Sequence, residues 1–200
     1  VKQEKDFTKT FGDKIVEMAK DDKRIVAITA AMPEGTGLDK FANIFPDRFF
    51  DVGMAEQHAV GFAAGLARKG LKPLVAIYST FLQRSYDIKA SHDGPETGED
   101  GPTHHGVFDI SYIRNFPNIV SMAPRDEEEL DDMLSWVMSY DKGPVAIRYP
   151  RGASYKYCSS EVSTSKIADK PRAPISLGKG ELLKQGKDVT IVSAGYMSNV

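Results

Sequence analysis

The sequence predicts an α/β fold, in which a parallel β-sheet carries helices on both of its faces. Short apolar runs rich in β-branched residues alternate along the chain with longer segments whose apolar residues recur at helical spacing. Glycine, proline or polar turns separate the two kinds of segment. Alternating strands and helices form parallel sheets, and such sheets bind ligands at the carboxyl ends of their strands.

Each element in the first half of the chain has its own local signal. Phe7, Phe11 and Ile15 fall on one face of the first helix. Later helices are closed by Pro46, which cannot continue a helix, and by Gly70. The expected elements are a helix over residues 6–20, a buried strand over 25–30, a short helix over 38–45, a strand over 49–52, a helix over 55–69, and a strand over 74–78 that leads into a helix beginning near Ser79 or Thr80.

The second half continues the same alternation and then changes character. We expect a strand over 119–122, a helix over 126–140 with an acidic first turn that suits the helix dipole, and a strand over 145–149. These elements complete a first domain over residues 1–152. A polar stretch over 153–174 is interpreted as a linker. An apolar strand over 188–194 then begins a second α/β domain over 175–200, so the chain is expected to be a piece of a longer protein.

The composition predicts a soluble, cytoplasmic protein. The chain has 200 residues, a formal net charge of -2 and 41% hydrophobic residues, so it shows neither the basic surface that binds nucleic acid nor a membrane-spanning run. Cys158 is the single cysteine, which excludes an internal disulfide and suits a reducing compartment. Partners among nucleic acids and membranes are therefore not expected.

The segment Asp51-Val-Gly-Met-Ala-Glu-Gln-His58 places a carboxylate where a strand turns into a helix. The helix that follows Glu56 is small and apolar, and burial against it would raise the pKa of this carboxyl. From the spacing alone, a glutamate favoured at a helix start by the dipole remains the simpler interpretation.

Three further segments bring polar side chains to strand ends or turns. In Ile77-Tyr-Ser-Thr-Phe-Leu-Gln-Arg-Ser-Tyr-Asp87, the aromatic rings would face either a ligand or the core. The turn Gly98-Glu-Asp-Gly-Pro-Thr-His-His-Gly106 carries adjacent histidines, whose side chains diverge and so suit proton transfer better than binding of one metal ion. Arg148-Tyr-Pro-Arg-Gly152 offers guanidinium groups that suit phosphate oxygens.

These four segments, in this order, resemble the transketolase-like thiamine-diphosphate enzymes. The Tyr-Ser-Thr-Phe-Leu-Gln-Arg string resembles the deoxyxylulose-phosphate synthase family, which argues against the β subunits of 2-oxo-acid dehydrogenases and against transketolase itself. The resemblance implies a pyrimidine-binding domain over residues 1–152 and the start of a transketolase C-terminal domain. It also implies that Glu56 bonds the N1′ atom of the cofactor's aminopyrimidine and promotes formation of the nucleophilic ylid.

The same resemblance implies roles for the other segments. Phe81 would stack on the pyrimidine, and Tyr78 and Arg84 would line the cofactor and substrate pocket. His104 is implied as a catalytic residue that, with Asp100, faces the acceptor substrate.

In the last segment, Arg151 would hold the phosphate of glyceraldehyde 3-phosphate, whereas Arg148 is expected to be structural. His105 is a less defined member of the pocket. No metal ligand is expected in this chain.

The implied activity is a thiamine-diphosphate-dependent transferase. It would condense pyruvate with glyceraldehyde 3-phosphate, with loss of CO2, to give 1-deoxy-D-xylulose 5-phosphate for isoprenoid, thiamine and pyridoxal synthesis. The family implies a homodimer in the bacterial cytosol or in plastids. One alternative is another transketolase-like enzyme. Another is a non-catalytic module that pairs with a separate diphosphate-binding domain.

The chain departs from the family pattern in two places. It has no Gly-Asp-Gly run with a distal Asn, the motif that holds the diphosphate through Mg²⁺ in an N-terminal domain. The chain alone is therefore expected to be inactive. The stretch near residues 88–98 is also too short for both a crossover and a strand, which predicts that one central strand is missing.

Overall fold

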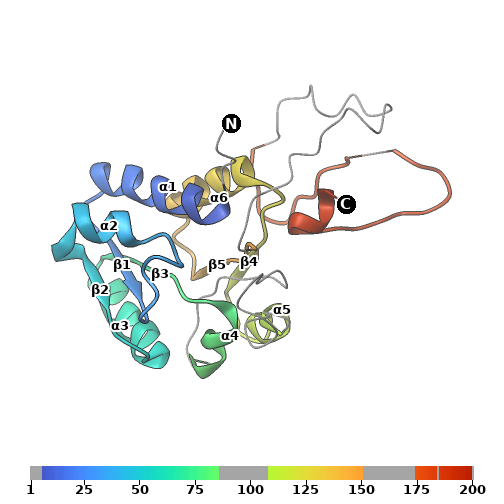
Figure 1. Cartoon of the computed structure of the whole chain (residues 1–200). Coiled ribbons are helices and arrows are strands. Elements are labelled where there is room, and N and C mark those ends of the chain that lie inside the picture. Colours follow the sequence, from blue (N-terminus) through green and yellow to red (C-terminus); the bar gives the residue numbers. More distant parts are fainter. Residues whose placement is uncertain (1–5, 86–107, 151–173, 184, 200) are drawn as a thin grey trace.

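The computed structural model describes residues 6–85, 108–150, 174–183 and 185–199 (Figure 1). Its elements, in order, are α1 (Phe7–Asp21), β1 (Ile25–Thr29), α2 (Asp39–Ile44), η1 (Pro46–Arg48), β2 (Phe49–Asp51), α3 (Glu56–Arg68), β3 (Lys72–Val75), α4 (Ser79–Leu82), η2 (Gln83–Ser85), α5 (Asp109–Ile113), β4 (Val120–Met122), α6 (Glu127–Ser139), β5 (Val145–Ile147) and η5 (Gly195–Asn199). The alternation of parallel strands and helices confirms the predicted α/β class.

The three longest helices, α1, α3 and α6, begin and end within one residue of their predicted bounds. Asp6 caps α1 by accepting a hydrogen bond from Lys9 N, and Asp126 caps α6 by accepting one from Glu129 N at 2.9 Å. The acidic first turn of α6 also lies at the positive end of the helix dipole. Figure 1 shows α1 and α6 side by side above the strands, where they cover one face.

The strands of the described residues form two parallel sheets, in keeping with the predicted parallel α/β arrangement. One sheet has the order β2-β1-β3, and the other pairs β4 with β5. All five residues of β1 are buried because this strand is flanked on both sides and covered on both faces. All four residues of β3 are half-buried instead. In Figure 1, β5 lies between β3 and β4, yet no strand pairing joins β3 to β5.

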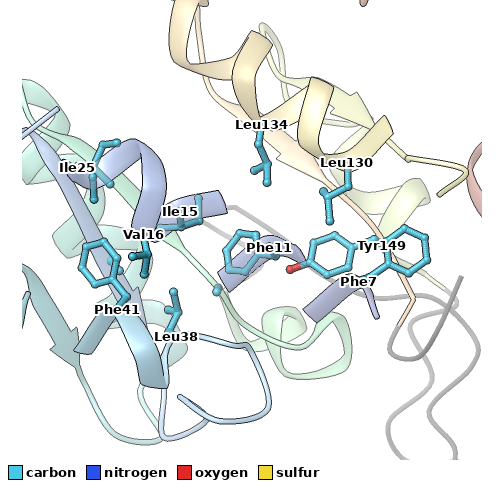
Figure 2. Close-up of a cluster of buried hydrophobic side chains, with 13 residues drawn as sticks. Phe7, Phe11, Ile15, Val16, Ile25, Leu38, Phe41, Leu130, Leu134 and Tyr149 are labelled. Atoms are coloured by element: carbon cyan, nitrogen blue, oxygen red, sulfur yellow. The ribbon is translucent and has the colours of Figure 1, made fainter. Parts of the chain in front are cut away.

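One buried cluster holds the two sheets together through side chains (Figure 2). Phe7 and Phe11 of α1 pack against Tyr149, with ring centroids 6.0 Å and 5.8 Å apart. Leu130 and Leu134 of α6 close the cluster from the other side. Burial of this apolar area is the main stabilising contribution that spans both sheets.

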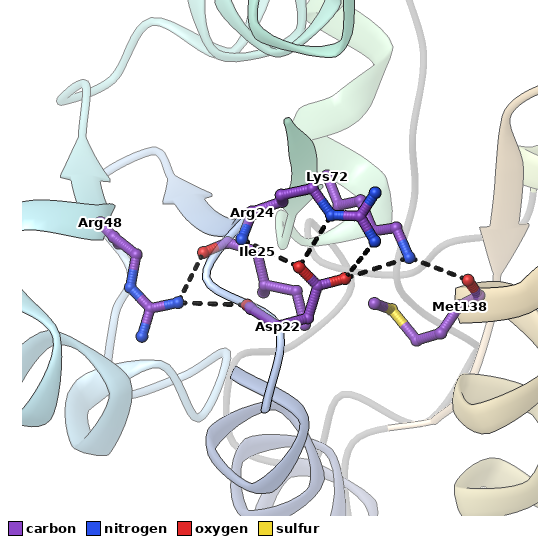
Figure 3. Close-up of polar contacts among 6 residues, drawn as sticks. All are labelled: Asp22, Arg24, Ile25, Arg48, Lys72 and Met138. Carbon is purple, nitrogen blue, oxygen red and sulfur yellow. Dashed lines mark hydrogen bonds and ion pairs between the residues drawn. The ribbon is translucent and has the colours of Figure 1, made fainter. Parts of the chain in front are cut away.

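A polar cluster at the end of α1 links this helix to β3 and α6 (Figure 3). Asp22 accepts two hydrogen bonds from the Arg24 side chain, at 2.9 Å and 2.7 Å. Lys72 of β3 lies 3.2 Å from the Asp22 carboxylate and donates to Met138 O at 2.9 Å. Arg48 donates to backbone carbonyls at the end of α1, including Ala19 O at 3.0 Å. Asp22 and its partners therefore join α1, β3 and α6.

Two local features differ from the prediction. β3 begins two residues earlier than expected and ends at Val75, although Ala76 N still donates to Ile28 O of β1 at 2.9 Å and the Ala76 carbonyl accepts from the Thr29 hydroxyl at 2.9 Å. The helix expected near Ser79 or Thr80 is confirmed, because α4 begins at Ser79 and is continued by η2. The short helix α5 was not predicted at all.

The strand predicted over residues 188–194 is wrong. The described residues there pair with no described strand, and Val189, Ile191 and Val192 are exposed. An isolated extended segment has neither a ladder partner nor a core to cover its apolar face, so it is not held as a strand. The shortened stretch near 88–98 lies outside the described residues, as does the linker over 153–174 apart from its last residue.

Candidate functional site

The site begins at the turn between β2 and α3. Asp51 Oδ1 accepts hydrogen bonds from Ala31 N at 2.7 Å and from Gly53 N at 2.9 Å. These bonds tie together the carboxyl ends of β1 and β2. Gly53 has φ +67, a left-handed conformation that glycine adopts without strain. The turn thus directs the chain into α3, whose first residue is Glu56.

Glu56 carries a buried carboxylate with unused hydrogen-bonding capacity. The residue is 3% exposed, although it stands at the start of a helix. Oε2 has no directed hydrogen bond among the described residues. Within the described part of the chain, Oε2 forms an ion pair with Arg84, whose Nη1 lies 3.0 Å away but outside hydrogen-bond geometry. A buried carboxylate oxygen without a donor is costly, so this atom is suited to accept a hydrogen bond from a ligand.

The α4–η2 segment faces the start of α3. It carries Phe81 and Arg84, three residues apart and thus on neighbouring positions of the same helical surface. Arg84 also donates from Nη1 to Met54 O at 3.3 Å, which fixes the guanidinium beside the β2–α3 turn. The ring of Phe81 is half-buried and stacks on Tyr78, with centroids 6.1 Å apart.

Tyr78 is largely enclosed by neighbouring residues. It is 9% exposed, and its backbone N–H donates to Met32 Sδ at 3.4 Å. A side chain added at Gly35 would overlap the Tyr78 hydroxyl, so the 32–37 turn packs directly on this ring. Tyr78 is therefore enclosed between the 32–37 turn and the ring of Phe81.

Next to this segment, a buried polar network joins the start of α4, α5 and the end of β5. Arg148 Nε donates to Asp109 Oδ2, and the Tyr112 hydroxyl donates to Ser79 O at 3.2 Å. Burial raises the pKa of Asp109, although the charge and hydrogen bond of Arg148 act in the opposite direction. Burial also raises the pKa of Tyr112 to about 12. Arg148 thus has the structural position expected for it.

The structure brings together only part of the predicted site. Glu56 and Arg84 are in contact, and Tyr78 and Phe81 stack on the same segment as Arg84. The other predicted site residues, namely Asp100, His104, His105 and Arg151, lie outside the described residues.

Sequence reasoning missed Asp51 and Asp109, which position the site without belonging to the predicted ligand contacts. The Asp-x-Gly spacing at residues 51–53 is a turn signal that pointed to Asp51. Nothing local marked Asp109, because its partner Arg148 is 39 residues away.

Neither a metal centre nor a membrane-spanning segment is found in the described part of the chain. No group of three or more His, Cys, Asp or Glu side chains within it is arranged to hold a metal ion. None of its helices has both the length and the apolar character needed to cross a bilayer.

The fold and the β2–α3 turn place this chain in a family of cofactor-binding domains. It matches the model of the transketolase pyrimidine-binding domain over residues 3–156, and it belongs to that family. Its relatives include 1-deoxy-D-xylulose-5-phosphate synthases. The one from Heliobacterium modesticaldum is 49% identical, with 97% of this chain and 30% of the relative covered. The one from Thermomicrobium roseum is 52% identical, with 94% and 31% covered.

The chain therefore spans about 30% of the length of these curated relatives. The alignment with the Heliobacterium protein extends over 208 positions, whereas 97% of this 200-residue chain is 194 residues. The relative thus carries about 14 residues that have no counterpart here.

Solved structures support the same fold. A split-gene transketolase, described as an inactive β4 tetramer, has a TM-score of 0.77 and 27% identity, and the match covers 98% of this chain and 64% of that one. Transketolase from Campylobacter jejuni has a TM-score of 0.61 over 73% of this chain and 26% of its own, at 20% identity, which supports the fold alone.

Proposed function

We propose that this chain is the pyrimidine-binding part of a 1-deoxy-D-xylulose-5-phosphate synthase and holds the aminopyrimidine of thiamine diphosphate at Glu56. The whole enzyme is a transferase of the cytoplasm, or of plastids in a plant. It condenses pyruvate with glyceraldehyde 3-phosphate, with loss of CO2, to form 1-deoxy-D-xylulose 5-phosphate. About 50% identity to relatives of that name supports this assignment.

The observation that carries the proposal is the buried oxygen Oε2 of Glu56. It is a hydrogen-bond acceptor without a directed donor, at the start of a helix and beside the carboxyl ends of β1 and β2. Ligands of parallel sheets bind at this end of the strands. A ring nitrogen that carries a proton would satisfy this oxygen, so the residues present fit the aminopyrimidine group.

The other residues of the site would orient the ring and the substrates. Phe81 presents a half-buried ring that can stack on the pyrimidine, and the enclosed Tyr78 holds Phe81 in place. When bound, the cofactor would supply the nucleophilic carbon for reaction with the 2-oxo acid. The role of Glu56 is to hold a proton at the ring nitrogen, which promotes deprotonation of that carbon.

We propose that the substrate contacts come from both sides of the site. Arg84 would face the substrate from η2. Asp100 and His104 would face the acceptor, with His104 moving a proton, and Arg151 would bind the acceptor phosphate.

The remaining part of the cofactor site would lie in another domain of the same enzyme. That domain would hold the diphosphate through Mg²⁺, and the whole enzyme would be a homodimer. Alone, this chain would bind thiamine diphosphate weakly and catalyse nothing. We also propose that the residues which the relatives have and this chain lacks belong between Asp87 and Gly98. The sequence there is too short for a crossover and a strand.

A second candidate is a split-gene module that works only with a separate diphosphate-binding chain. The observation that favours it is the match to a split-gene transketolase over 98% of this chain. Mixing this chain with a separately produced diphosphate-binding domain tests both candidates, because activity should appear only in the mixture.

Binding of the pyrimidine alone is the direct test of the site. We expect calorimetric titration with 4-amino-5-hydroxymethyl-2-methylpyrimidine, the pyrimidine half of thiamine, to show saturable binding that Glu56→Gln weakens at least tenfold. Glu17→Gln is the matched control, because Glu17 is an exposed glutamate on α1. Equal binding by wild type and Glu56→Gln would rule out the proposed role of Glu56.

A further inference from the structure

Arg84 covers the buried carboxylate of Glu56 from the solvent side. Its side chain is 52% exposed, whereas that of Glu56 is 3% exposed. Nη1 lies 3.0 Å from Glu56 Oε2 and also donates to Met54 O at 3.3 Å. One guanidinium nitrogen thus contacts both the last part of the β2–α3 turn and the first residue of α3.

The guanidinium has the chemistry expected of the ligand. It is planar and cationic, and it presents N–H donors in one plane, as does the protonated edge of an aminopyrimidine. Phe81, the ring expected to stack on the pyrimidine, is three residues before Arg84 on the same helical surface. Arg84 therefore contacts Glu56 Oε2, the acceptor that a bound pyrimidine needs. It does so from the same segment as Phe81, the ring expected to stack on the pyrimidine.

We propose that Arg84 is an internal competitor of the cofactor pyrimidine. In the absence of ligand, its guanidinium neutralises Glu56 and occupies the place of the ring nitrogen. An aminopyrimidine binds only when the Arg84–Glu56 contact breaks, which leaves the guanidinium available to face the substrate side. This inference rests on the proposed function of Glu56.

The geometry limits the size of the effect. The contact lacks hydrogen-bond directionality, and half of the arginine side chain is in water, so it is a weak ion pair. Its loss should strengthen pyrimidine binding by about two- to fivefold, the range that partly exposed ion pairs give.

The test is a mutant cycle in the full chain, measured by calorimetric titration with 4-amino-5-hydroxymethyl-2-methylpyrimidine. Arg84→Gln removes the charge and should tighten binding about two- to fivefold, whereas Arg84→Lys keeps the charge without the planar fork and should tighten binding less than Arg84→Gln does. In the Glu56→Gln background, Arg84→Gln should have no further effect, because the competed carboxylate is gone.

The outcomes separate this inference from the proposed function. Glu56-dependent binding that Arg84→Gln leaves unchanged or weakens overturns the competitor role and leaves the pyrimidine site intact. Absence of saturable binding in wild type and Arg84→Gln alike overturns both. As a measurement that needs no variant, the side-chain NMR signals of Arg84 in the wild-type chain should shift on saturation with the pyrimidine, and an unchanged signal would contradict displacement.

Discussion

Arg148, at the end of β5, donates from Nε to the carboxylate of Asp109, which is 1% exposed and begins α5. This ion pair connects the end of β5 to α5, and the Tyr112 hydroxyl of α5 donates to Ser79 O at the start of α4. The segment carrying Phe81 and Arg84 is thereby linked to β5 through α5, by an ion pair between residues 39 positions apart.

The first prediction concerns this pair. Arg148→Met should reduce the free energy of unfolding by roughly 3–5 kcal/mol at pH 7, because it leaves the Asp109 carboxylate buried without a cation. Burial already raises the pKa of Asp109, so its protonated form is favoured in the folded state. Stability from this carboxyl is therefore present below its unfolded pKa of about 4 and is lost as the pH rises through the raised value.

The loss caused by Arg148→Met should accordingly shrink toward low pH, as Asp109 becomes protonated. Urea unfolding at a series of pH values measures this. Arg114→Met is the control, since Arg114 is exposed and should change stability by no more than about 0.5 kcal/mol. A loss that is the same at pH 4 and pH 7 would contradict the assignment.

The second prediction concerns Tyr112. Burial raises its pKa to about 12, so its neutral form is favoured in the folded state. Stability from this phenol should persist up to its unfolded pKa of about 10 and fall as the pH rises toward 12. Ultraviolet titration of the folded chain follows the absorbance of ionised tyrosines. Tyr112→Phe should remove the contribution of one tyrosine, at the high-pH end of the titration curve. The variant should also lose about 0.5–1.5 kcal/mol at pH 7 with the hydrogen bond to Ser79 O.

The third prediction compares two helical glycines. A Cβ at Gly12 of α1 would overlap the carbonyl oxygen of Gly37, whereas a Cβ at Gly65 of α3 meets no atom within 4 Å. Gly12→Ala should therefore destabilise the chain by about 1–3 kcal/mol. Gly65→Ala should stabilise it by about 0.5–1 kcal/mol, because alanine costs less backbone entropy in a helix. Chemical denaturation of both variants checks the opposite signs, and a loss at both positions would disprove the steric argument.

The fourth prediction concerns Asp22. Hydrogen bonds from Arg24 hold the pKa of the Asp22 carboxyl well below its ordinary value. This stabilisation is present above the unfolded pKa of about 4 and is lost as the pH falls toward the lowered folded value. Asp22→Asn should thus destabilise the chain at pH 7 and flatten the acid limb of its stability curve. Asp21→Asn, at the neighbouring exposed position, should leave that limb unchanged.

Sequence patterns predicted the elements whose signals are local. The apolar spacing of α1 and the capping and acidic turn of α6 are properties of neighbouring residues, so both helices were located to within one residue. Just beyond β3, the Ala76 carbonyl accepts from the hydroxyl of Thr29, 47 residues away, and no local pattern contains that hydrogen bond. The helix α5 was missed for another reason: its five residues are too few to show a helical period.

The candidate site divides in the same way. The strand, glycine and helix start around Glu56 are written in consecutive residues, but this spacing alone favoured a plain helix-start glutamate, and its role as an acceptor was predicted from the family resemblance. Its contact with Arg84 joins positions 28 residues apart, and its burial depends on how α4 and η2 pack on α3. The sequence placed Glu56 and Arg84 in the same predicted pocket, whereas their direct contact and the burial of the carboxylate depend on tertiary packing that no local pattern contains.

β3 and β5 share packed side chains but no ladder of amide bonds, so among the described residues the two halves of the domain are held together by close packing and by side-chain contacts, such as Lys72 to Met138 O and Tyr112 to Ser79 O. Dispersion contacts weaken steeply with small separations, unlike a row of directed amide bonds. A cavity near Leu130 would therefore separate the two halves before either half lost its own strand pairs. The first local unfolding of the described structure should accordingly occur between β3 and β5.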